Sequence, residues 1–518
     1  MSLKQQASTG SEVDERLAAL VTNANAIRAI SSAVEGTLGP KGLDTMLVDQ
    51  FGEVVITNDG VTILTMMEAN HPAARMLINI ARAQQEEIGD GTTTATVMAG
   101  ALVSTGVDQV ARGVPVARVI EGLRAGIKRG LQAIEDYSRP VEDTDDPVLL
   151  QVALVAGREH QDIADLVVRA AALVGKEKLN DRAFKLSDTV AAEEGADNQV
   201  FMGVIINKEK MNRHMPVEIC APAVLIIDDA LEPEEIEEEA LATEAGFARY
   251  LELQNQHRQG VQKIIDLGVG LVLVDRGVDD TAEEMLTDAG IMVVQRVSAR
   301  ELRKAAEHTG ARMIKRTGLK KDAGILKQYL GKALRTYNDE KLEQVWILEG
   351  SGKPMATVLV GAATSEVVGE RERIAKDAAS AVQAAVKGGV IPGGGAVEMA
   401  AVPDVEKVRA GMRGMAAYGV DCVLEALKRP MAQIVANAGF NPLEKLGDVL
   451  AAQAETGKPS LAVDCDTGNI CDMYELGVMD PTLVKTYALK AAGEIAEAIL
   501  RIDTIIKKRE VKKDSLEV

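Results

Sequence analysis

The sequence contains few aromatic residues, few cysteines and no long apolar run. Phe, Trp and Tyr make up 3% of the 518 residues, so the core must be built from Ala, Val, Ile, Leu and Met. Four scattered cysteines without a CxxC pair argue against a disulfide framework, and five histidines without an HxxxH pair argue against a zinc site. No apolar run approaches the roughly 18 residues of a membrane span, and the polar N-terminus lacks the apolar core of a signal peptide. We therefore expect a cytoplasmic protein without a membrane partner.

Acidic residues outnumber basic ones, 78 to 58, and the formal net charge is −20. A nucleic-acid partner is therefore not expected, since phosphate backbones are held by clustered Lys and Arg. The composition of 47% hydrophobic and 26% charged residues is typical of a globular protein. The chain is too long for one hydrophobic core, and its length suggests about three or four domains.

Both ends of the chain are predicted to be helical. Apolar residues recur at spacings of three and four between residues 17 and 30, which places them on one face of a helix. Further helices are expected after Gly91, over 116–137, 371–386, 405–438 and 484–506. This pattern suggests one domain made from both termini, with the middle of the chain inserted into it.

The middle of the chain changes to an α/β pattern. Three short apolar runs read as buried strands, and helical stretches near 279–289 and 299–308 favour a βαβ arrangement. The three runs are VLII at 224–227, LVLV at 271–274 and IMVV at 291–294. The first crossover, 228–270, is about twice as long as one helix and two short loops require. Six Glu lie between residues 232 and 239, so the excess is either a solvated surface helix or a protrusion that meets a partner.

Three clusters of Gly and Asp are candidates for phosphate chemistry. They are ITNDG at 56–60, GDGTTT at 89–94, and Asp377 followed by PGGG at 392–395. In GDGTTT the glycines permit close backbone approach, and the threonines open a helix whose N–H groups suit a phosphate. Asp90 would be repelled by that phosphate unless a cation such as Mg²⁺ lay between them. Taken alone, an Asp-Gly-Thr turn is more often a helix N-cap.

Taken together and in order, several runs resemble those of the chaperonin family. They are TLGPKGLDTMLVD, ITNDGVTIL, HPAARMLINIARAQQEEIGDGTTTATVMAGAL, PGGGAVE and GVMDPTLVKTYALKAAGEIAEAILRIDTII, spaced across nearly the whole chain. The Asn of ITNDG, together with HPAARML and ILRIDTII, resembles the group II, thermosome-like branch of the family. Asp480 of VMDPT instead resembles group I, and VAGR at 155–158 lies where archaeal members commonly carry a Thr-Gly-Lys run. These mixed features are interpreted as those of a divergent group II-like member, with a bacterial source as one reading.

The resemblance implies a multidomain α and α/β fold. An α-helical equatorial domain built from both termini would bind nucleotide, and a hinged intermediate domain would join it to an α/β apical domain. It also favours the protrusion over the solvated helix, because group II subunits carry a helical protrusion there as a built-in lid. The expected bounds are 1–142 and 398–518 (equatorial), 143–210 and 359–397 (intermediate), 211–358 (apical) and about 232–257 (protrusion).

The resemblance also assigns roles to individual residues. Asp59 and Asp377 would orient and deprotonate the attacking water, and Asp90 would ligate Mg²⁺. Arg158 is a candidate sensor of the γ-phosphate, although it offers a planar fork in place of the family's lysine point charge. K⁺ is a further candidate ion. The residues expected to hold ATP are Leu38, Gly39, Pro40, Gly91, Thr92, Thr93, Thr94, Gly394 and, at the ribose, Asp480.

The function implied by the resemblance is ATP-dependent assistance of protein folding. Copies of the chain would form a double ring that encapsulates unfolded polypeptides and closes without a separate cap protein. A chaperonin-like binding scaffold without turnover is the main alternative, and the presence of Asp59, Asp90 and Asp377 argues against it. A small-molecule kinase is a second alternative, which the acidic insert disfavours.

Overall fold

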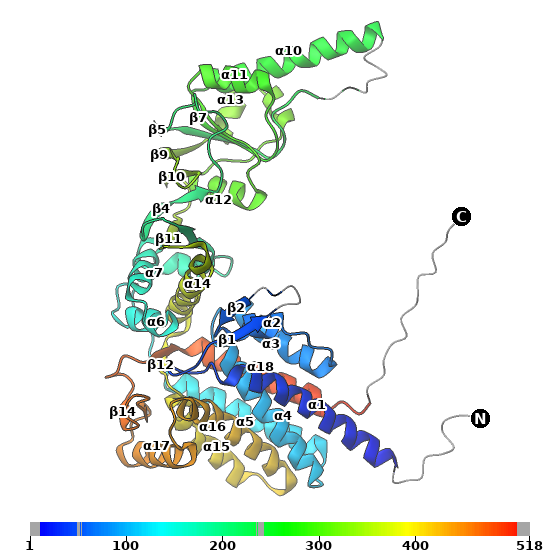
Figure 1. Cartoon of the computed structure of the whole chain (residues 1–518), viewed down its shortest axis with the longest axis vertical. Helices are drawn as coiled ribbons and strands as arrows, with labels where there is room; N and C mark the ends of the chain where they lie inside the picture. Colours follow the sequence, from blue (N-terminus) through cyan, green and yellow to red (C-terminus); the bar gives the residue numbers. More distant parts are fainter. Residues whose placement is uncertain (1–10, 49–51, 53, 235, 237–242, 505–518) are drawn as a thin grey trace, which may run out of the picture. The chain divides into compact units, whose positions relative to one another are not determined.

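The chain folds into two compact units. The computed structural model describes residues 11–48, 52, 54–234, 236 and 243–504 (Figure 1). Unit 1 comprises Met1–Ala164 and Lys376–Val518, and unit 2 comprises Asp165–Ala375. A largely helical unit is thus assembled from both termini and an α/β unit is inserted, which confirms the predicted fold class. The bounds of the five predicted domain segments stay a prediction.

Unit 1 is built around one fully packed helix, α4. Its side chains are buried almost all round between Thr92 and Val107, as its composition of Ala, Val, Thr and Gly requires of a core helix. Leu20, Ala24 and Ile27 of α1 belong to the same core, which confirms the predicted helical face. The helices of this part are α1 (Ser11–Glu35), α2 (Gly60–Met66), α3 (Pro72–Glu87), α4 (Thr92–Ala111), α5 (Val116–Asp136), α6 (Val148–Ala156), α14 (Ser365–Gly388), α15 (Ala396–Gly411), α16 (Ala417–Asn437), α17 (Pro442–Thr456) and α18 (Thr482–Leu500).

Two helix predictions need correction. The stretch 405–438 is not continuous, because α15 ends at Gly411 and α16 begins at Ala417. The C-cap residue of α15, Met412, is extended with a ψ of 129°, and Gly414 follows it with a left-handed φ of +73°. The last helix, α18, ends at Leu500 rather than at 506.

Within the described ranges, no helix is both long enough and apolar enough to cross a membrane.

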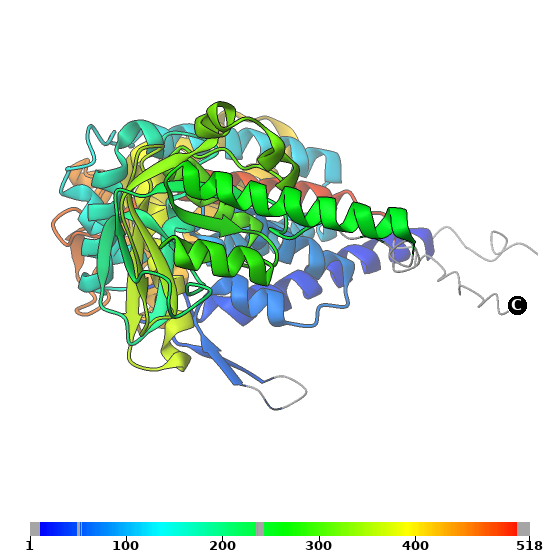
Figure 2. The same ribbon diagram turned by 90° about the horizontal axis from the view of Figure 1, so that it is seen from above.

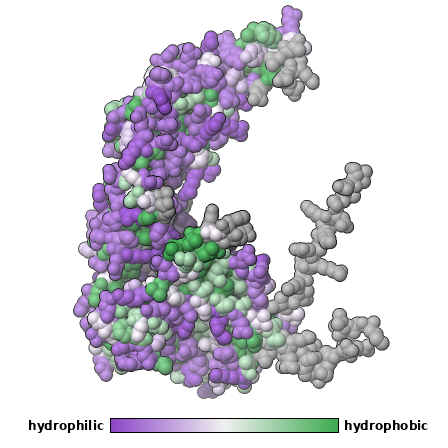
Figure 3. All heavy atoms as spheres, in the orientation of Figure 1, coloured by the Kyte–Doolittle hydropathy of each residue, from purple (hydrophilic) through white to green (hydrophobic). Residues whose placement is uncertain are grey.

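Unit 1 also carries three small two-stranded sheets. They pair β1 (Thr45–Val48) with β2 (Val54–Thr57), β12 (Val390–Pro392) with β15 (Met479–Pro481), and β13 (Leu461–Val463) with β14 (Ile470–Asp472). The hairpin of β1 and β2 projects from the helices of unit 1 in both views (Figures 1 and 2). Its apolar side chains are exposed, and Figure 3 shows hydrophobic surface at this position. The exposed residues are Leu43, Met46, Val48, Val54 and Ile56.

Unit 2 contains a mixed sheet of nine strands in the order β3-β11-β4-β10-β9-β6-β7-β8, with β5 paired to β9. The strands are β3 (Val190–Glu194), β4 (Gln199–Ile206), β5 (Glu218–Cys220), β6 (Ala223–Ile227), β7 (Val269–Val274), β8 (Met292–Val294), β9 (Gly331–Asp339), β10 (Gln344–Gly350) and β11 (Ala356–Ala362). The helices are α7 (Gln161–Val174), α8 (Lys176–Leu179), α10 (Glu244–Asp266), α11 (Asp280–Asp288), α12 (Ala299–Thr309) and α13 (Ala323–Leu326). The three predicted apolar runs are the parallel neighbours β6, β7 and β8.

These parallel strands are apolar throughout because both of their faces are covered. Alternate residues of β7 enter different cores: Val272 packs with Ile264 of α10 and Leu286 of α11, whereas Leu271 packs with Leu302 of α12. The period of two along a strand explains this division. A run without polar alternation therefore indicates a strand buried on both sides, as the sequence predicts.

The only tryptophan of the chain lies in unit 2. Trp346 of β10 is 2% exposed, and its ring stacks between those of Phe201 on β4 and Tyr337 on β9. The centroid of its ring lies 4.5 Å from that of Phe201 and 5.4 Å from that of Tyr337. A chain poor in aromatic residues thus gathers three of them in one sheet.

We expect Gly122→Ala to lower the thermal unfolding temperature of the protein. In most helices this change adds about 1 kcal/mol of stability. Here α5 and α16 meet backbone to backbone, and a Cβ on Gly122 would overlap the carbonyl oxygen of Ala416. The helices would have to separate, at a cost of about 1–3 kcal/mol.

Gly447→Ala is the matched control for this experiment. Gly447 lies within α17, and a Cβ placed there meets no atom within 4 Å. The control should raise the unfolding temperature slightly. Equal shifts in the two variants would contradict the close approach of α5 and α16.

Candidate functional site

The GDGTTT motif forms the turn that starts α4. Gly91 is the N-cap residue, with a left-handed φ of +80°, and no side chain caps the helix. The carboxylate of Asp90 accepts a hydrogen bond from the Gly91 N–H at 2.6 Å. The Asp-Gly-Thr turn is thus the N-cap turn of α4, with Gly91 and not Asp90 as the N-cap residue. Thr92, Thr93 and Thr94 occupy the first turn, at the positive end of a 20-residue helix.

Asp59 lies at the start of α2, against the start of α4. Its carboxylate caps α2 by accepting hydrogen bonds from the Thr62 N–H at 2.9 Å and the Thr62 hydroxyl at 2.6 Å. A Cβ on the next residue, Gly60, would overlap the hydroxyl oxygen of Thr93. Only glycine lets the two helix starts approach this closely, and Asp59 is thereby brought beside the first turn of α4.

The start of α18 completes this contact from the other side. A Cβ on Gly91 would lie 2.5 Å from a methyl carbon of Val484. Gln84 of α3 connects the two turns, because its side-chain amide donates to the carbonyl of Asp90 at 2.7 Å and to that of Val484 at 3.2 Å. Gln84 is fully buried, and it is a residue that sequence reasoning missed.

Three charged side chains meet where α15, β15 and α18 come together. The ammonium of Lys485 lies 3.0 Å from a carboxylate oxygen of Glu398 and 3.0 Å from one of Asp480. Glu398 is fully buried and Lys485 almost so, whereas the Asp480 side chain is 17% exposed. Burial alone would lower the pKa of Lys485, but the two carboxylates outweigh burial and raise it. Lys485 therefore stays charged.

Asp90 lies close enough to this cluster for the charges of Asp480 and Lys485 to affect its pKa. Burial, followed by the carboxylate of Asp480, raises the pKa of Asp90 from 3.8 to about 6, although Lys485 partly opposes the rise. Negative charge is thus in excess here, and a cation would relieve it. Among the residues that the structure describes, no three His, Cys, Asp or Glu side chains form a metal cluster. A cation here would therefore need water or phosphate oxygens as further ligands.

The predicted phosphate loop follows α1 and rests on α16. Gly39 has a left-handed φ of +86°, and a Cβ there would lie 3.1 Å from Ile434. The side-chain amide of Asn437 donates to the carbonyl of Leu38 at 2.8 Å and to that of Glu35 at 2.9 Å. Pro40 follows Gly39 at the exposed tip of this loop.

The PGGG run rests on the same helix. A Cβ on Gly395 would lie 2.8 Å from the Cβ of Met431, one turn from Ile434 on α16. Gly394, with a left-handed φ of +63°, is the preceding residue. Both glycine loops therefore lie against α16.

Asp377 and Arg158 approach the same region through α14. A Cβ on Gly89 would overlap the side chain of Ser380, which lies one turn along α14 from Asp377. Gly157, just before Arg158, faces Ala378 of the same helix, 3.5 Å from its own Cβ position. Arg158 is half-buried and has a φ of +52°, an uncommon backbone conformation for a non-glycine residue. Through Gly157, the turn that carries Arg158 lies against α14.

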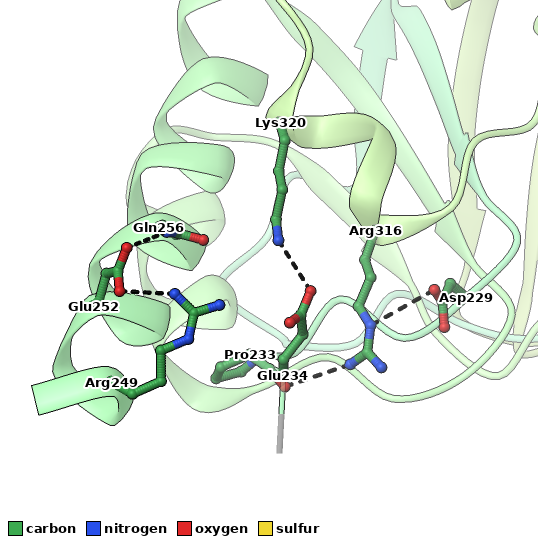
Figure 4. A network of polar contacts seen from close by, with 8 residues as sticks. All are labelled: Asp229, Pro233, Glu234, Arg249, Glu252, Gln256, Arg316 and Lys320. Carbon is green, nitrogen blue, oxygen red and sulfur yellow. Dashed lines mark hydrogen bonds and ion pairs between the residues drawn. The ribbon is translucent and has the colours of Figure 1, made fainter. Parts of the chain in front are cut away.

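In unit 2, the segment that leaves β6 is held by ion pairs to a 3₁₀ turn, η3 (Arg316–Lys320) (Figure 4). The guanidinium of Arg316 lies 3.7 Å from the Asp229 carboxylate, and the ammonium of Lys320 lies 3.0 Å from that of Glu234. Lys263 of α10 donates to the carbonyl of Leu319 at 3.1 Å. Both ends of the long crossover are thus tied to the same turn.

Helix α10 runs beyond the rest of unit 2 at its N-terminal end (Figures 1 and 2). Leu253 is buried at its base, whereas Phe247 and Leu251 are each 53% exposed and Tyr250 is 37% exposed. Their spacings of three and four place the exposed three on one face of the helix. Most of the predicted Glu-rich stretch lies outside the described residues.

Comparisons with known proteins agree on one family. A sequence model of the TCP-1/cpn60 chaperonin family matches residues 30–510. A thermosome subunit of Pyrococcus abyssi is 35% identical over 512 residues, which are 95% of this chain and 92% of the relative. The thermosome subunit beta of Archaeoglobus fulgidus is 34% identical over the same shares of both chains.

A solved structure of a group III chaperonin in the open state is similar along its whole length. The TM-score is 0.89 and the identity is 47%, over 95% of this chain and 100% of the other. This identity exceeds that to the two thermosome subunits.

We expect Asp90→Asn to stabilise the nucleotide-free protein near neutral pH. Since the folded protein binds the Asp90 proton more tightly than the unfolded chain, its free energy of unfolding falls as the pH rises from about 4 to about 6. Asparagine removes the charge and keeps the oxygen that accepts from Gly91. The gain should reach up to about 3 kcal/mol, at about 1.4 kcal/mol per pKa unit, and vanish below about pH 4.

Denaturant unfolding across this pH range would measure the difference between the two proteins. Asp108→Asn is the matched control, because Asp108 is exposed on the same helix. A stability difference for Asp90→Asn that does not change with pH would rule out the raised pKa.

Proposed function

Because the chain belongs to the TCP-1/cpn60 chaperonin family, we propose that it is an ATP-hydrolysing subunit of a double-ring folding chamber. The observation that carries the proposal is the meeting of the α2, α4 and α18 starts around Asp59, Asp90 and Asp480. Backbone N–H groups, carboxylates and glycine loops of this kind suit a phosphate chain with its metal. The reaction is hydrolysis of ATP to ADP and phosphate.

The nucleotide would lie between the two glycine loops and the start of α4. Leu38, Gly39 and Pro40 would line the phosphates from one side, and Gly91 with Thr92, Thr93 and Thr94 would donate from the other. Gly394 would pack against the nucleotide, and Asp480 would accept hydrogen bonds from the ribose hydroxyls. The rigid support of both loops by α16 favours this reading, since positioning is most of what phosphoryl transfer requires.

Asp90 is the residue that we assign to Mg²⁺. Its raised pKa indicates a carboxylate in need of a positive neighbour, and this need supports the assignment. Bound Mg²⁺ would supply positive charge to the phosphate oxygens. Asp90 would hold the ion, and its carboxylate also accepts a hydrogen bond from the Gly91 N–H.

Asp59 and Asp377 would position and deprotonate the attacking water. Asp59 is held firmly by its two bonds to Thr62, and α14 brings Asp377 to the Gly89 turn. Asp377 lies in the unit 1 part of α14, two residues after the end of unit 2, so motion of unit 2 transmitted along this helix would shift Asp377. Hydrolysis would in this way be coupled to domain movement. Arg158, on a turn that faces α14, remains the candidate sensor of the γ-phosphate.

The hairpin of β1 and β2 supports assembly of the ring. An isolated two-stranded hairpin with exposed apolar side chains is marginal in water, and it gains stability when another chain covers it. We assign it to contacts between neighbouring copies. Helix α10 would form the built-in lid, with its exposed apolar face meeting neighbouring protrusions or unfolded polypeptide.

We expect Asp377→Ala to remove most ATP hydrolysis while leaving ATP affinity largely unchanged, because Asp377 acts on the water and not on the nucleotide. Hydrolysis would be measured without any added acceptor, which also separates this function from a kinase and from a scaffold without turnover. Asp90→Ala is the contrasting variant, and it should weaken Mg²⁺-ATP binding as well. An equal loss of binding and turnover in Asp377→Ala would contradict its role.

We expect the triple change of Phe247, Tyr250 and Leu251 to Ser to abolish ATP-dependent protection of a trapped substrate from protease. The three side chains are exposed, so the fold and ATP hydrolysis should be kept. Serine at Asn255, Arg258 and Gln259, exposed polar positions of the same helix, is the control. Full protection by the apolar-to-Ser variant would remove the lid role from α10.

A further inference from the structure

The cluster of Lys485, Glu398 and Asp480 is arranged asymmetrically with respect to solvent. Glu398 is fully buried, so it cannot reach a ligand, whereas Asp480 keeps 17% of its side chain exposed. Lys485 lies between them, 3.0 Å from each. Any effect of Glu398 on a ligand must therefore pass through Lys485 to Asp480.

Lys485 holds one oxygen of the Asp480 carboxylate, and Gly393 leaves room for that oxygen. The Oδ2 atom of Asp480 is the one that faces the Lys485 ammonium. The same oxygen would lie 3.1 Å from a Cβ on Gly393, so a side chain at residue 393 would crowd it. Asp480 also sits in β15, paired with Ile391 of β12. The carboxylate consequently has one constrained orientation, with Oδ1 as the oxygen left for a ligand.

Glu398 in turn fixes Lys485. A lysine side chain is long and flexible, and a single carboxylate would leave its ammonium free to follow a moving partner. Glu398 holds the ammonium from the opposite side, and neither of its oxygens has another hydrogen-bond partner among the described residues. Because Glu398 is fully buried and Lys485 is its partner among the described residues, we expect Glu398 to affect a ligand only through Lys485.

We propose that Lys485 and Glu398 are positioning residues that orient Asp480 for the ribose of the nucleotide and so determine selection of ribonucleotides over deoxyribonucleotides. This inference rests on the proposed function, because it assumes that ATP binds at this cluster. Lys485 occupies Oδ2, which leaves Oδ1 to accept from a ribose hydroxyl. Hydrogen bonds to charged groups are about twice as strong as neutral ones. A correctly oriented Asp480 should therefore bind ATP more tightly than a nucleotide that lacks the ribose hydroxyl.

The test compares hydrolysis of ATP and of 2′-deoxy- and 3′-deoxy-ATP by the wild-type protein, Lys485→Met and Glu398→Gln. For the wild type we expect at least one deoxynucleotide to have a KM about tenfold or more above that of ATP. In both variants this ratio should fall to within about twofold of one, while kcat at saturating ATP changes little. Lys490→Met, an exposed lysine of the same helix, is the matched control and should keep the wild-type ratio.

A double-mutant cycle separates positioning from a general structural effect. If Lys485 acts through Asp480, the double variant Lys485→Met with Asp480→Asn should show the same selectivity as Asp480→Asn alone. Glu398→Gln keeps the side-chain shape but removes the charge that holds the Lys485 ammonium in place, so it tests the positioning role if Lys485→Met does not fold.

The two possible failures can be told apart. A wild-type protein that binds no ATP would overturn the proposed function, and this inference with it. With binding intact, unchanged selectivity in Lys485→Met and Glu398→Gln would overturn only the positioning role. Additive losses of selectivity in the double variant would also overturn it.

Discussion

Asp90, Asp480 and Glu398 hold three carboxylates close together in a helical unit whose core is otherwise aliphatic, with the single ammonium of Lys485 among them. Burying charge is costly unless each group is paired, and here the pairing is incomplete. The starts of α4 and α18, which point their positive ends toward this region, offset part of that cost. Glycines at residues 60, 91 and 393 are needed because any side chain there would force the elements apart.

A different constraint shapes unit 2. Its parallel strands are covered on both faces, so the sheet itself offers no free apolar surface at β6 or β7. Three exposed apolar side chains lie on one face of α10, whose base is anchored by Leu253 and by the contacts of Lys263 to η3. Because its base is held in place, the helix can extend into solvent. We expect its exposed apolar face to contact another molecule.

Much of this arrangement could be predicted from local patterns. Apolar runs such as 271–274 predict strands buried on both faces, and the order of the glycine motifs indicates the site. The sequence analysis does not predict strands β9, β10 and β11, although β10 and β11 contain the apolar runs 345–348 and 358–360. The break between α15 and α16 was missed because helical spacing resumes directly after Gly414.

The supporting residues of the site were harder to foresee. Gln84 and Asn437 act through backbone carbonyls that are distant in sequence, and a lone amide on a helix carries no pattern that identifies such a contact. Glu398 and Lys485 lie within recognisable motifs, yet only the packing of α15 against α18 brings them together.

The single tryptophan offers a different benefit. Emission from an indole depends on the polarity around it, so Trp346 gives the intact chain an optical probe of the unit 2 sheet, and unfolding confined to unit 1 would leave that signal unchanged.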